Sequence, residues 1–425
     1  MQRYWVGDRN HSEDMPYCLV LQNYSAPSKL KKLSNMSSPL KAISCFLLVN
    51  ALFFTTSYGQ DVTSNKFGKG LRITAADSSF ALKFGLRFQT LYDGRLNLEN
   101  QDYDDRLLTR RYRLKFDGFV YNPKLVYKLE LGISNQDISG GDIPQTGETS
   151  RIILDAVIKW NFKPHWTLWF GQTKLPGNRE RVISSQALQF VDRSNVNSRF
   201  NIDRDAGIQL HYEEDKIKLI GSISTGDGRN IITNQVGGYD YTVRGEYLPF
   251  GEFTNGGDYF SSDLSREEKP KLSIGVTYDY NDRATRQRGQ LGDFLSAQRD
   301  LESIFIDAYF KYNGISSLIE YANKKSPDGP VIFDDSGNFV EAFYTGSGIS
   351  WQAGYLFKNN FEIAGRFTQV TPEKITLRNE NTQYTLGLSR YIVGHNLKIQ
   401  SDFTLIKEDS KDDMLMTRLQ VELAF

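Results

Sequence analysis

The sequence predicts an all-β chain that closes into a transmembrane antiparallel β-barrel of about sixteen strands. Apolar and polar residues alternate with a period of two in one segment after another from residue 80 to the C-terminus. No segment in this part approaches the roughly 18 consecutive apolar residues of a membrane-spanning helix. The connections are short and long in turn, as they are at the two rims of an outer-membrane barrel.

The alternating segments are long enough to cross a bilayer as tilted strands. In FALKFGLRFQ (80–89) every second side chain is apolar, and Lys83 and Arg87 lie on the opposite face. The last segment, MLMTRLQVELAF (414–425), alternates in the same way and ends on Phe425. We predict strands at 80–92, 107–121, 124–134, 150–161, 166–174, 204–213, 215–224, 239–247, 270–280, 302–313, 314–323, 347–357, 361–370, 382–393, 395–408 and 414–425.

The connections indicate which ends of the strands share a rim. Connections after even strands are short turns, such as Tyr-Asn-Pro-Lys and Asn-Gly, whereas those after odd strands are mostly long, polar and rich in Gly, Asp and Ser. One connection departs from this rule, because 248–269 follows an even strand and is long. It either folds back at the periplasmic mouth or marks a slip in the strand count. A soluble β-sandwich would have shorter strands and loops of similar length at both ends.

The start of the chain has the features of a secretory signal. Ala42–Phe54 is the only long apolar run, Lys41 precedes it, and Ser57-Tyr58-Gly59 offers a small-x-small cleavage site. We therefore expect cleavage after Gly59. The predicted organisation is 1–35 as an over-extended start or leader, 36–59 as signal peptide, 60–79 as a short periplasmic segment and 80–425 as the barrel.

Composition narrows the function. The chain has 51 basic and 51 acidic residues, so it lacks the basic excess that a nucleic-acid partner would require. Both cysteines, Cys18 and Cys45, precede Gly59, so the mature chain has neither disulfides nor a cysteine metal site. His165, His211 and His395 are its histidines, and it contains no HExxH or GxSxG motif. These observations give little support for catalysis, and we predict no enzyme activity.

Five aromatic residues bracket the turn between the fourth and fifth strands. We predict that they belong to the periplasmic aromatic girdle of the barrel. They are Trp160, Phe162, Trp166, Trp169 and Phe170.

In a barrel of this kind the polar set of each strand faces the water-filled interior. Basic residues gather on the first, second and sixteenth strands, which become neighbours when the barrel closes. We predict an anion track along this wall, made of Lys83, Arg87, Arg111, Arg113, Lys115 and Arg418. Inward acids oppose it on other strands, at Asp117, Glu130, Asp155, Asp240, Glu246, Asp307, Glu362, Asp402 and Glu422.

Several runs resemble the phosphate-selective porin O and P family, in its Bacteroidetes-type versions. They are GQTKLP (171–176), FVDRS (190–194) and RDAGIQL (204–210), with further matches at 84–95 and 109–131. The resemblance implies a sixteen-stranded barrel in the outer membrane of a Gram-negative bacterium, commonly trimeric and without a bound cofactor. It implies passive diffusion of small hydrophilic solutes, with anions such as phosphate as the finer expectation. The alternative is a plugged barrel that binds ligands or surfaces through its long loops.

The resemblance also implies that the loop 175–203 folds into the lumen as a constriction. A cationic bias at a constriction of low dielectric would concentrate anions. If each basic residue instead pairs with a neighbouring acid, these residues only hold the loop in place and attract no anions. The sequence leaves both interpretations open. The basic residues concerned are Lys174, Arg179, Arg181, Arg193, Arg199 and Arg204.

The expected partners follow from the barrel and the resemblance. They are outer-membrane lipid and lipopolysaccharide, small anionic or polar solutes, and two further copies of the chain in a homotrimer. The terminal Phe425 resembles the C-terminal aromatic residue by which the outer-membrane assembly machinery recognises its clients.

Overall fold

The computed structural model describes residues 61–63, 66–138, 151–233 and 237–425. The predicted leader and signal peptide lie outside the described residues. Val62–Phe425 belong to one compact unit, and of the second unit, Tyr4–Asp61, only Asp61 is described. No helix in the described part of the chain is long and apolar enough to cross a membrane.

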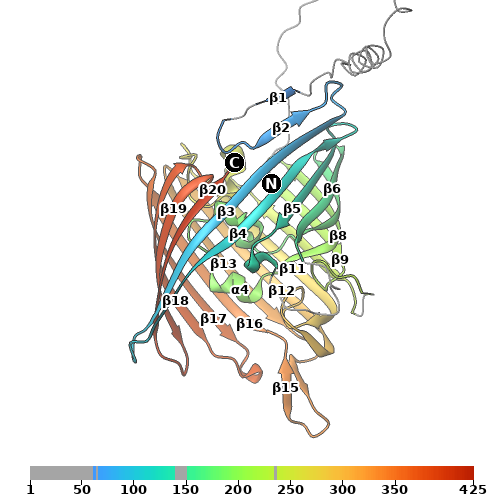
Figure 1. Ribbon diagram of the computed structural model, residues 1–425. Helices are drawn as coiled ribbons and strands as arrows, with labels where there is room; N and C mark the ends of the chain where they lie inside the picture. Colours follow the sequence, from blue (N-terminus) through green and yellow to red (C-terminus); the bar gives the residue numbers. More distant parts are fainter. Residues whose placement is uncertain (1–60, 64–65, 139–150, 234–236) are drawn as a thin grey trace, which may run out of the picture. The chain divides into compact units, whose positions relative to one another are not determined.

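Sixteen strands of the described residues pair antiparallel in chain order, and the last pairs with the first, which closes the barrel (Figure 1). All sixteen predicted strands are confirmed. They are β3 (Phe80–Asn97), β4 (Tyr103–Val120), β5 (Leu125–Gly132), β6 (Ile153–Lys163), β7 (Trp166–Lys174), β8 (Arg204–Glu214), β9 (Ile217–Ser224), β10 (Asp240–Tyr247), β11 (Lys271–Arg286), β12 (Phe294–Tyr312), β13 (Ile315–Lys325), β16 (Gly346–Leu356), β17 (Phe361–Pro372), β18 (Asn381–Val393), β19 (Leu397–Glu408) and β20 (Met414–Ala424).

The seam between β20 and β3 runs from Met414 opposite Asn97 to Ala424 opposite Arg87. Phe425 extends it, because its N–H donates to the Leu86 carbonyl at 2.9 Å and its carbonyl accepts from the Leu86 N–H at 2.8 Å. Phe425 therefore extends the pairing of β20 with β3 by one residue. An unpaired edge at this position would leave backbone groups unsatisfied in lipid.

Strands outside the predicted set occur at the N-terminus and in one loop. The segment 60–79 contains β1 (Asp61–Thr63) and β2 (Leu71–Thr74), and β2 pairs with β3 beyond the end of β20. The loop after β13 forms a hairpin of β14 (Val331–Phe333) and β15 (Phe339–Ala342), which projects from one end of the barrel (Figure 1).

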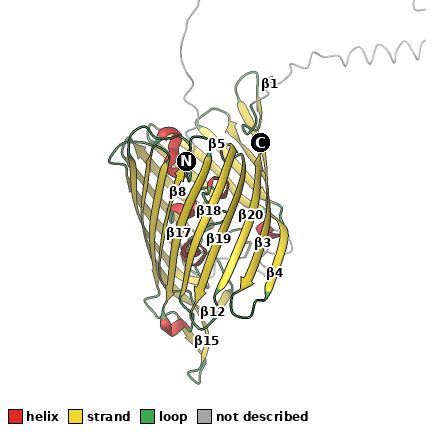
Figure 2. Ribbon diagram, turned by 90° about the vertical axis from the view of Figure 1, so that its left-hand side faces the viewer, coloured by secondary structure: helices red, strands yellow, loops and turns green. Residues whose placement is uncertain are grey.

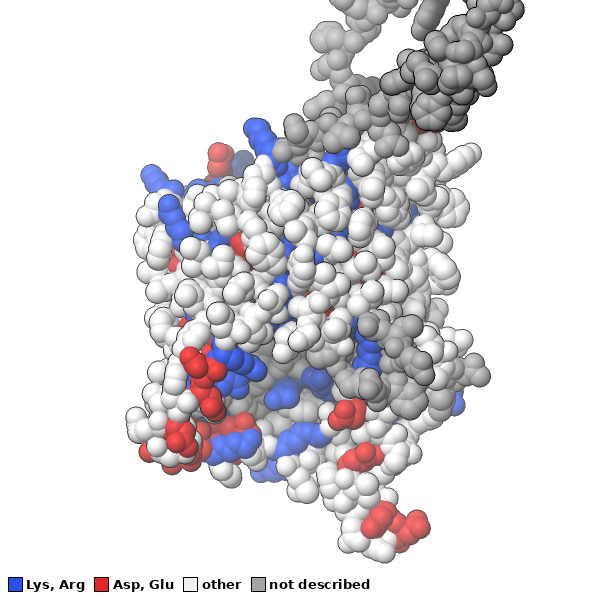
Figure 3. Space-filling model, viewed as in Figure 1, with Lys and Arg blue, Asp and Glu red and all other residues white. Residues whose placement is uncertain are grey.

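The tilted strands form the wall of the barrel (Figure 2), and their side chains alternate between an apolar outer face and a polar inner face. On β10, Tyr241 and Val243 are exposed, whereas Thr242 and Arg244 are buried. The same order holds along the other strands, and between the two rims the visible outer surface is almost free of charged side chains (Figure 3). On this side the exposed charges gather at the rims, and many charged residues of the strands are buried inside the barrel.

The long connection 248–269 does not mark a slip in the strand count, because β10 and β11 pair directly on either side of it. It contains the short helix η3 (Thr254–Tyr259) and turns into the barrel from the rim that carries the short turns. We call this rim the short-turn rim and the opposite one the long-loop rim.

Candidate functional site

The loop 175–203, called the constriction segment below, folds into the lumen as predicted. It contains α3 (Arg179–Val182), η2 (Ser185–Ala187) and α4 (Asn195–Phe200). Its polar groups bond to inner-face residues of distant strands, among them Gln189 to Glu362 at 2.8 Å and the Val191 N–H to Asp402 at 3.1 Å. These bonds span many strands, so the segment crosses the lumen.

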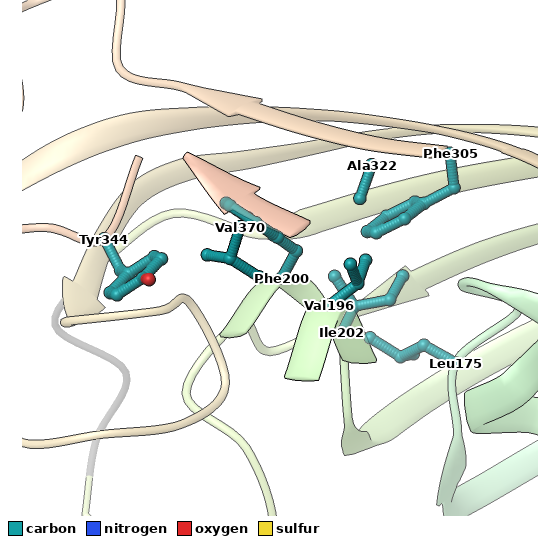
Figure 4. Close-up of a cluster of buried hydrophobic side chains, with 8 residues drawn as sticks. All are labelled: Leu175, Val196, Phe200, Ile202, Phe305, Ala322, Tyr344 and Val370. Carbon is teal, nitrogen blue, oxygen red and sulfur yellow. The ribbon is translucent and has the colours of Figure 1, made fainter. Parts of the chain in front are cut away.

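Ser194 caps the N-terminus of helix α4, because its hydroxyl accepts a hydrogen bond from the Asn197 N–H. Its apolar side chains Val196 and Phe200 point toward Phe305 and Val370 of the barrel wall (Figure 4). Burying these side chains holds the helix against one side of an otherwise polar lumen. The complete cluster is Leu175, Val196, Phe200, Ile202, Phe305, Ala322, Tyr344 and Val370.

Two inner-face glycines make room for the constriction segment. A Cβ at Gly348 would lie 2.9 Å from Val196 Cγ2 and 3.0 Å from Phe200 Cε2. A Cβ at Gly387 would lie 2.8 Å from Phe190 Cε1. Side chains at these positions would push the segment away from β16 and β18, so these glycines determine how closely it approaches the wall.

Asp192 ties the tip of the constriction segment to β4. Its carboxylate accepts from Arg110 Nη2 at 2.8 Å and from Arg111 Nη2 at 2.8 Å. Burial raises the pKa of the Asp192 carboxyl, but the charges of Arg110, Arg111 and Arg418 outweigh burial and hold this pKa well below its usual range. Asp192 is therefore a carboxylate at neutral pH, and it neutralises cations of the predicted anion track.

A carboxylate with a lowered folded-state pKa stabilises the fold fully above its unfolded pKa of about 3.9, and this contribution disappears as pH falls. Thermal unfolding in detergent measures it as the difference in Tm between the parent protein and Asp192→Asn. We expect a constant difference from about pH 5 to about pH 8, and a shrinking one below about pH 4. Since other titrating groups are common to both proteins, a difference that shrinks between about pH 5 and about pH 7 would contradict this assignment.

Arg179 anchors the base of the constriction segment in a closed square of charges. Its guanidinium lies 2.5 Å from Asp307 and 3.4 Å from Glu246, and Arg244 lies 2.7 Å from each of the same two acids. The side chains of all four residues are at most 1% exposed. Removing one member would leave an uncompensated buried charge, which costs about 3–5 kcal/mol.

The remaining basic residues of the constriction segment, Arg199 apart, are also held by specific partners. Arg181 pairs with Asp203, and Arg204 lies 2.8 Å from Asp155. Lys174 and Arg193 donate to backbone carbonyls of the segment, at 3.0 Å and 2.7 Å respectively. These contacts favour the second interpretation left open by the sequence, in which the basic residues hold the loop in place.

Arg199 is different, because it is exposed on α4 and forms no ion pair with any residue that the structure describes. Its guanidinium carbon lies 5.9 Å from the ring centre of Tyr344, and that of Arg378 lies 5.0 Å from the same centre. These two arginines form a cationic pair on one aromatic ring toward the long-loop rim.

The six residues of the predicted anion track divide into two groups. Arg87, Arg111, Arg113 and Arg418 are buried and ion-paired, and the closest contacts are Arg87–Glu422 at 2.6 Å, Arg111–Asp192 at 2.8 Å, Arg113–Asp137 at 2.7 Å and Arg418–Asp402 at 2.7 Å. Asp137 lies in α2 (Asn135–Ile138), so Arg113 also draws the loop after β5 inward. These four arginines are part of the framework of the wall.

Lys83 and Lys115 form the second group. Both are half-buried on the inner face, and neither forms an ion pair with a described residue. Lys115 Nζ donates to Gln186 Oε1 of the constriction segment at 3.1 Å, so it lies where the segment approaches the wall. Lys83 is opposite Asp117 in the register of β3 and β4, closer to the short-turn rim.

Two further lysines continue this wall. Lys128 on β5 lies 2.5 Å from Asp155 and 3.1 Å from Glu130, and Lys159 on β6 lies 3.4 Å from the ring centre of Trp169. Sequence reasoning missed both, although each occupies a polar position of an alternating strand. Together, the four inner-face lysines form the lysine wall, which consists of Lys83, Lys115, Lys128 and Lys159.

The girdle prediction is wrong for Trp169. Phe170 is 64% exposed on the outer face, so its neighbour Trp169 points inward, where it stacks on the buried His211 at 4.0 Å. Trp160 and Phe162 are exposed, as a girdle requires. Strict alternation from Phe170 would have placed Trp169 correctly.

Two of the described histidines contact backbone carbonyls. His165 Nδ1 lies 2.9 Å from the Glu213 carbonyl oxygen, and His395 contacts the Ser261 carbonyl at 3.0 Å. In the described part of the chain, no group of three or more His, Cys, Asp or Glu residues is arranged to hold a metal ion.

A closed antiparallel barrel with a loop folded across its lumen is the architecture of the porins. Residues 82–288 match the family model of the phosphate-selective porins O and P, which confirms the resemblance predicted from the sequence. An uncharacterized protein of Aquifex aeolicus (strain VF5) is 24% identical over 392 residues, covering 81% of this chain and 87% of the relative.

Solved structures of similar fold come from other outer-membrane barrels. An anion-selective porin from Comamonas acidovorans aligns with a TM-score of 0.51 and 13% identity, over 81% of this chain and 100% of that one. The outer membrane channel DcaP of Acinetobacter baumannii aligns at 0.52 and 12%, over 82% and 99%. The trimer form of OmpT, an outer membrane protein of Vibrio cholerae, aligns at 0.51 and 9%, over 81% and 99%. Together, the family match and the fold support an outer-membrane porin channel.

Proposed function

We propose that this protein is an outer-membrane porin through which small hydrophilic solutes diffuse passively, with a preference for anions. The observation that carries the anion preference is the pair Lys83 and Lys115, half-buried on the inner wall without an ionic partner among the described residues. Cations on a low-dielectric wall attract anions and raise their local concentration. Lys115 also bonds to the constriction segment, where the path is narrowed.

The distribution of paired charges supports the same direction. Six of the nine inner-face acids that oppose the track, among them Glu422 and Asp402, are ion-paired with an arginine, whereas Asp117, Asp240 and Glu362 form no ion pair with a described residue. Arg199 and Arg378 lie toward the long-loop rim without an ion-pair partner among the described residues. The name of the matched family and that of the anion-selective neighbour agree with an anion preference and with phosphate as a solute.

Reconstitution in planar bilayers tests the proposal. We expect discrete conductance steps and a reversal potential in a KCl gradient that indicates anion preference, with phosphate reducing the chloride current. Absence of steps from correctly folded protein would overturn the channel function, and a cation-selective reversal potential would overturn the preference alone. The comparisons with porins favour the channel over a plugged barrel that binds surfaces.

We infer that the chain functions as a homotrimer, as the trimer form of the Vibrio cholerae barrel suggests by analogy. We further propose that a signal peptide exports it and that lipid and lipopolysaccharide surround it in the membrane. Size measurement of the folded protein in detergent, with and without heating, distinguishes trimer from monomer.

A substitution at Phe425 can distinguish the role of its backbone in strand pairing from the role of its side chain in recognition by the assembly machinery. Its backbone bonds to Leu86 survive the change Phe425→Ala, whereas the aromatic side chain, 39% exposed, is lost. If assembly machinery reads this ring, the amount of Phe425→Ala in the outer membrane of expressing cells should fall about fivefold or more, while refolding in detergent stays unchanged. Equal amounts of parent and variant in the membrane would refute this role.

A further inference from the structure

The segment 248–269 is a second insertion into the lumen, and it starts from the rim opposite to the constriction segment. Asp258 accepts from Lys218 of β9 at 2.5 Å, and Ser262 Oγ donates to Glu362 of β17 at 2.7 Å. Asp258 and Ser262 are at most 1% exposed. Because β9 and β17 are far apart around the barrel, the segment crosses the lumen, and it is called the lower insert below.

Inner-face groups of several strands hold the lower insert. Lys311 Nζ donates to the carbonyls of Gly257 and Phe260, each at 2.9 Å, and the Tyr259 hydroxyl donates to Glu246 at 2.7 Å. Glu246 belongs to the square of charges that anchors Arg179. The lower insert and the constriction segment therefore share one anchor.

The two insertions also touch directly. The Ser261 N–H donates to the Ala187 carbonyl at 2.8 Å, and Arg179 Nη1 donates to the Asp258 carbonyl at 3.2 Å. The Phe260 ring packs against Ile183, Ala187 and Leu188 of the constriction segment. This apolar contact lies within a polar lumen, and it fixes the constriction segment from the side of the short-turn rim.

We propose that the lower insert is a wall of the constriction, which fixes the position of residues 183–189 and thereby sets the size of solute that passes. Without it, the Ala187 carbonyl loses its donor and the apolar side chains around Phe260 lose their cover. The constriction segment would then still be held by α4, by Asp192 at its tip and by polar bonds such as Gln186 to Asn396 and Lys398 to the Leu188 carbonyl. Its apolar side chains Ile183, Ala187 and Leu188 would lose the ring that covers them. The inference rests on the proposed channel function.

Two variants test the size-setting role by single-channel recording with neutral polymers of graded size. In the first, a short Gly-Ser linker replaces residues 252–266. In the second, Phe260→Ala removes the ring that packs on Ile183, Ala187 and Leu188 and stacks on His395, and the backbone of the segment is kept. We expect larger polymers to enter both variants and the conductance of the first to rise about 1.5-fold or more. The matched control is Phe250→Ala, because Phe250 lies in the same segment but is 54% exposed.

A cysteine pair decides whether the contact is a static wall or a gate. Residues 60–425 contain no cysteine, so Ala187→Cys with Ser261→Cys introduces one pair into a clean background, and the Ser261 N–H is retained. We expect equal conductance with the pair oxidised and reduced. A fall in conductance on oxidation would show that the contact must open for conduction, and this would overturn the proposal.

Failure of the size-setting role can be distinguished from failure of the channel function. If the shortened and Phe260→Ala proteins conduct with parental polymer exclusion, the lower insert does not set the size of the path, whereas the channel function stands. If the shortened protein fails to fold, Phe260→Ala and the cysteine pair still test the proposal. If the parent protein itself gives no conductance, the proposed function fails first.

Discussion

Replacing Asp192 with alanine is expected to loosen the constriction segment and widen the conducting path. The carboxylate of Asp192 bridges Arg110 and Arg111 at 2.8 Å each, and no other acid binds these guanidiniums in the described part of the chain. Its removal leaves two neighbouring cations that repel each other. The free energy that holds the tip of the segment to β4 should fall by about 2 kcal/mol, a value reduced because Asp192 is partly exposed. The tip of the segment should then move away from β4.

Single-channel recording with neutral polymers measures this effect without interference from the added positive charge. We expect the size limit for polymer entry to increase, with conductance about 1.5-fold higher or more and with greater current noise. Asp335→Ala is the matched control, since it removes an acid from the turn between β14 and β15. Unchanged polymer exclusion would show that α4 and the square of charges hold the segment without Asp192.

Reversing the charge of Lys83 and Lys115 together is expected to change the ion preference. A unit charge at about 4 Å is worth about 1–4 kcal/mol at effective dielectric constants between about 80 and about 20. Lys83→Glu with Lys115→Glu should therefore lower the ratio of chloride to potassium permeability about tenfold, as measured by reversal potentials in a KCl gradient. High salt should weaken the effect because it screens the charges.

Two controls make this prediction specific to Lys83 and Lys115. Lys124→Glu, in an exposed turn between β4 and β5, carries the same charge change and should leave the permeability ratio unchanged. Arg113→Gln should instead reduce stability, because Arg113 is bound by Glu130 and Asp137. If both lysine reversals leave the ratio unchanged in folded protein, the ion path runs elsewhere and the anion preference needs another source.

Most of the barrel could be predicted from the sequence because the bilayer imposes a simple rule on each strand separately. A strand with one face in lipid and one in water must alternate, and its length follows from the thickness of the membrane. The boundaries were less accurate at the long-loop ends of β3 and β12, which extend beyond the predicted segments. On β12, Asp300 and Glu302 interrupt the apolar face that Ile304 and Ile306 continue. The strand β2 was missed because four residues carry too little pattern.

The residues of the candidate site and the face of the strand that each occupies could be predicted from the sequence. Which of the charged residues are neutralised by an ion pair could not. Arg87 was correctly placed on the inner face, yet its partner Glu422 lies 335 positions further along the chain. Arg111 is neutralised by Asp192, 81 positions away in a loop without periodicity. Periodicity reports which face a residue occupies, whereas pairing depends on which loop folds over that face.

The amino-acid sequence by itself therefore determined the number of strands, the lipid-type outer face and the presence of a polar interior, because each follows from local alternation against a bilayer. Only the tertiary structure decided which cations stay without an ionic partner and that two insertions from opposite rims meet at Ser261 and Ala187. The physical reason is that both features depend on contacts between segments far apart in the sequence, and such contacts leave no local pattern. Whether a buried charge is neutralised depends on which oppositely charged side chain packs against it.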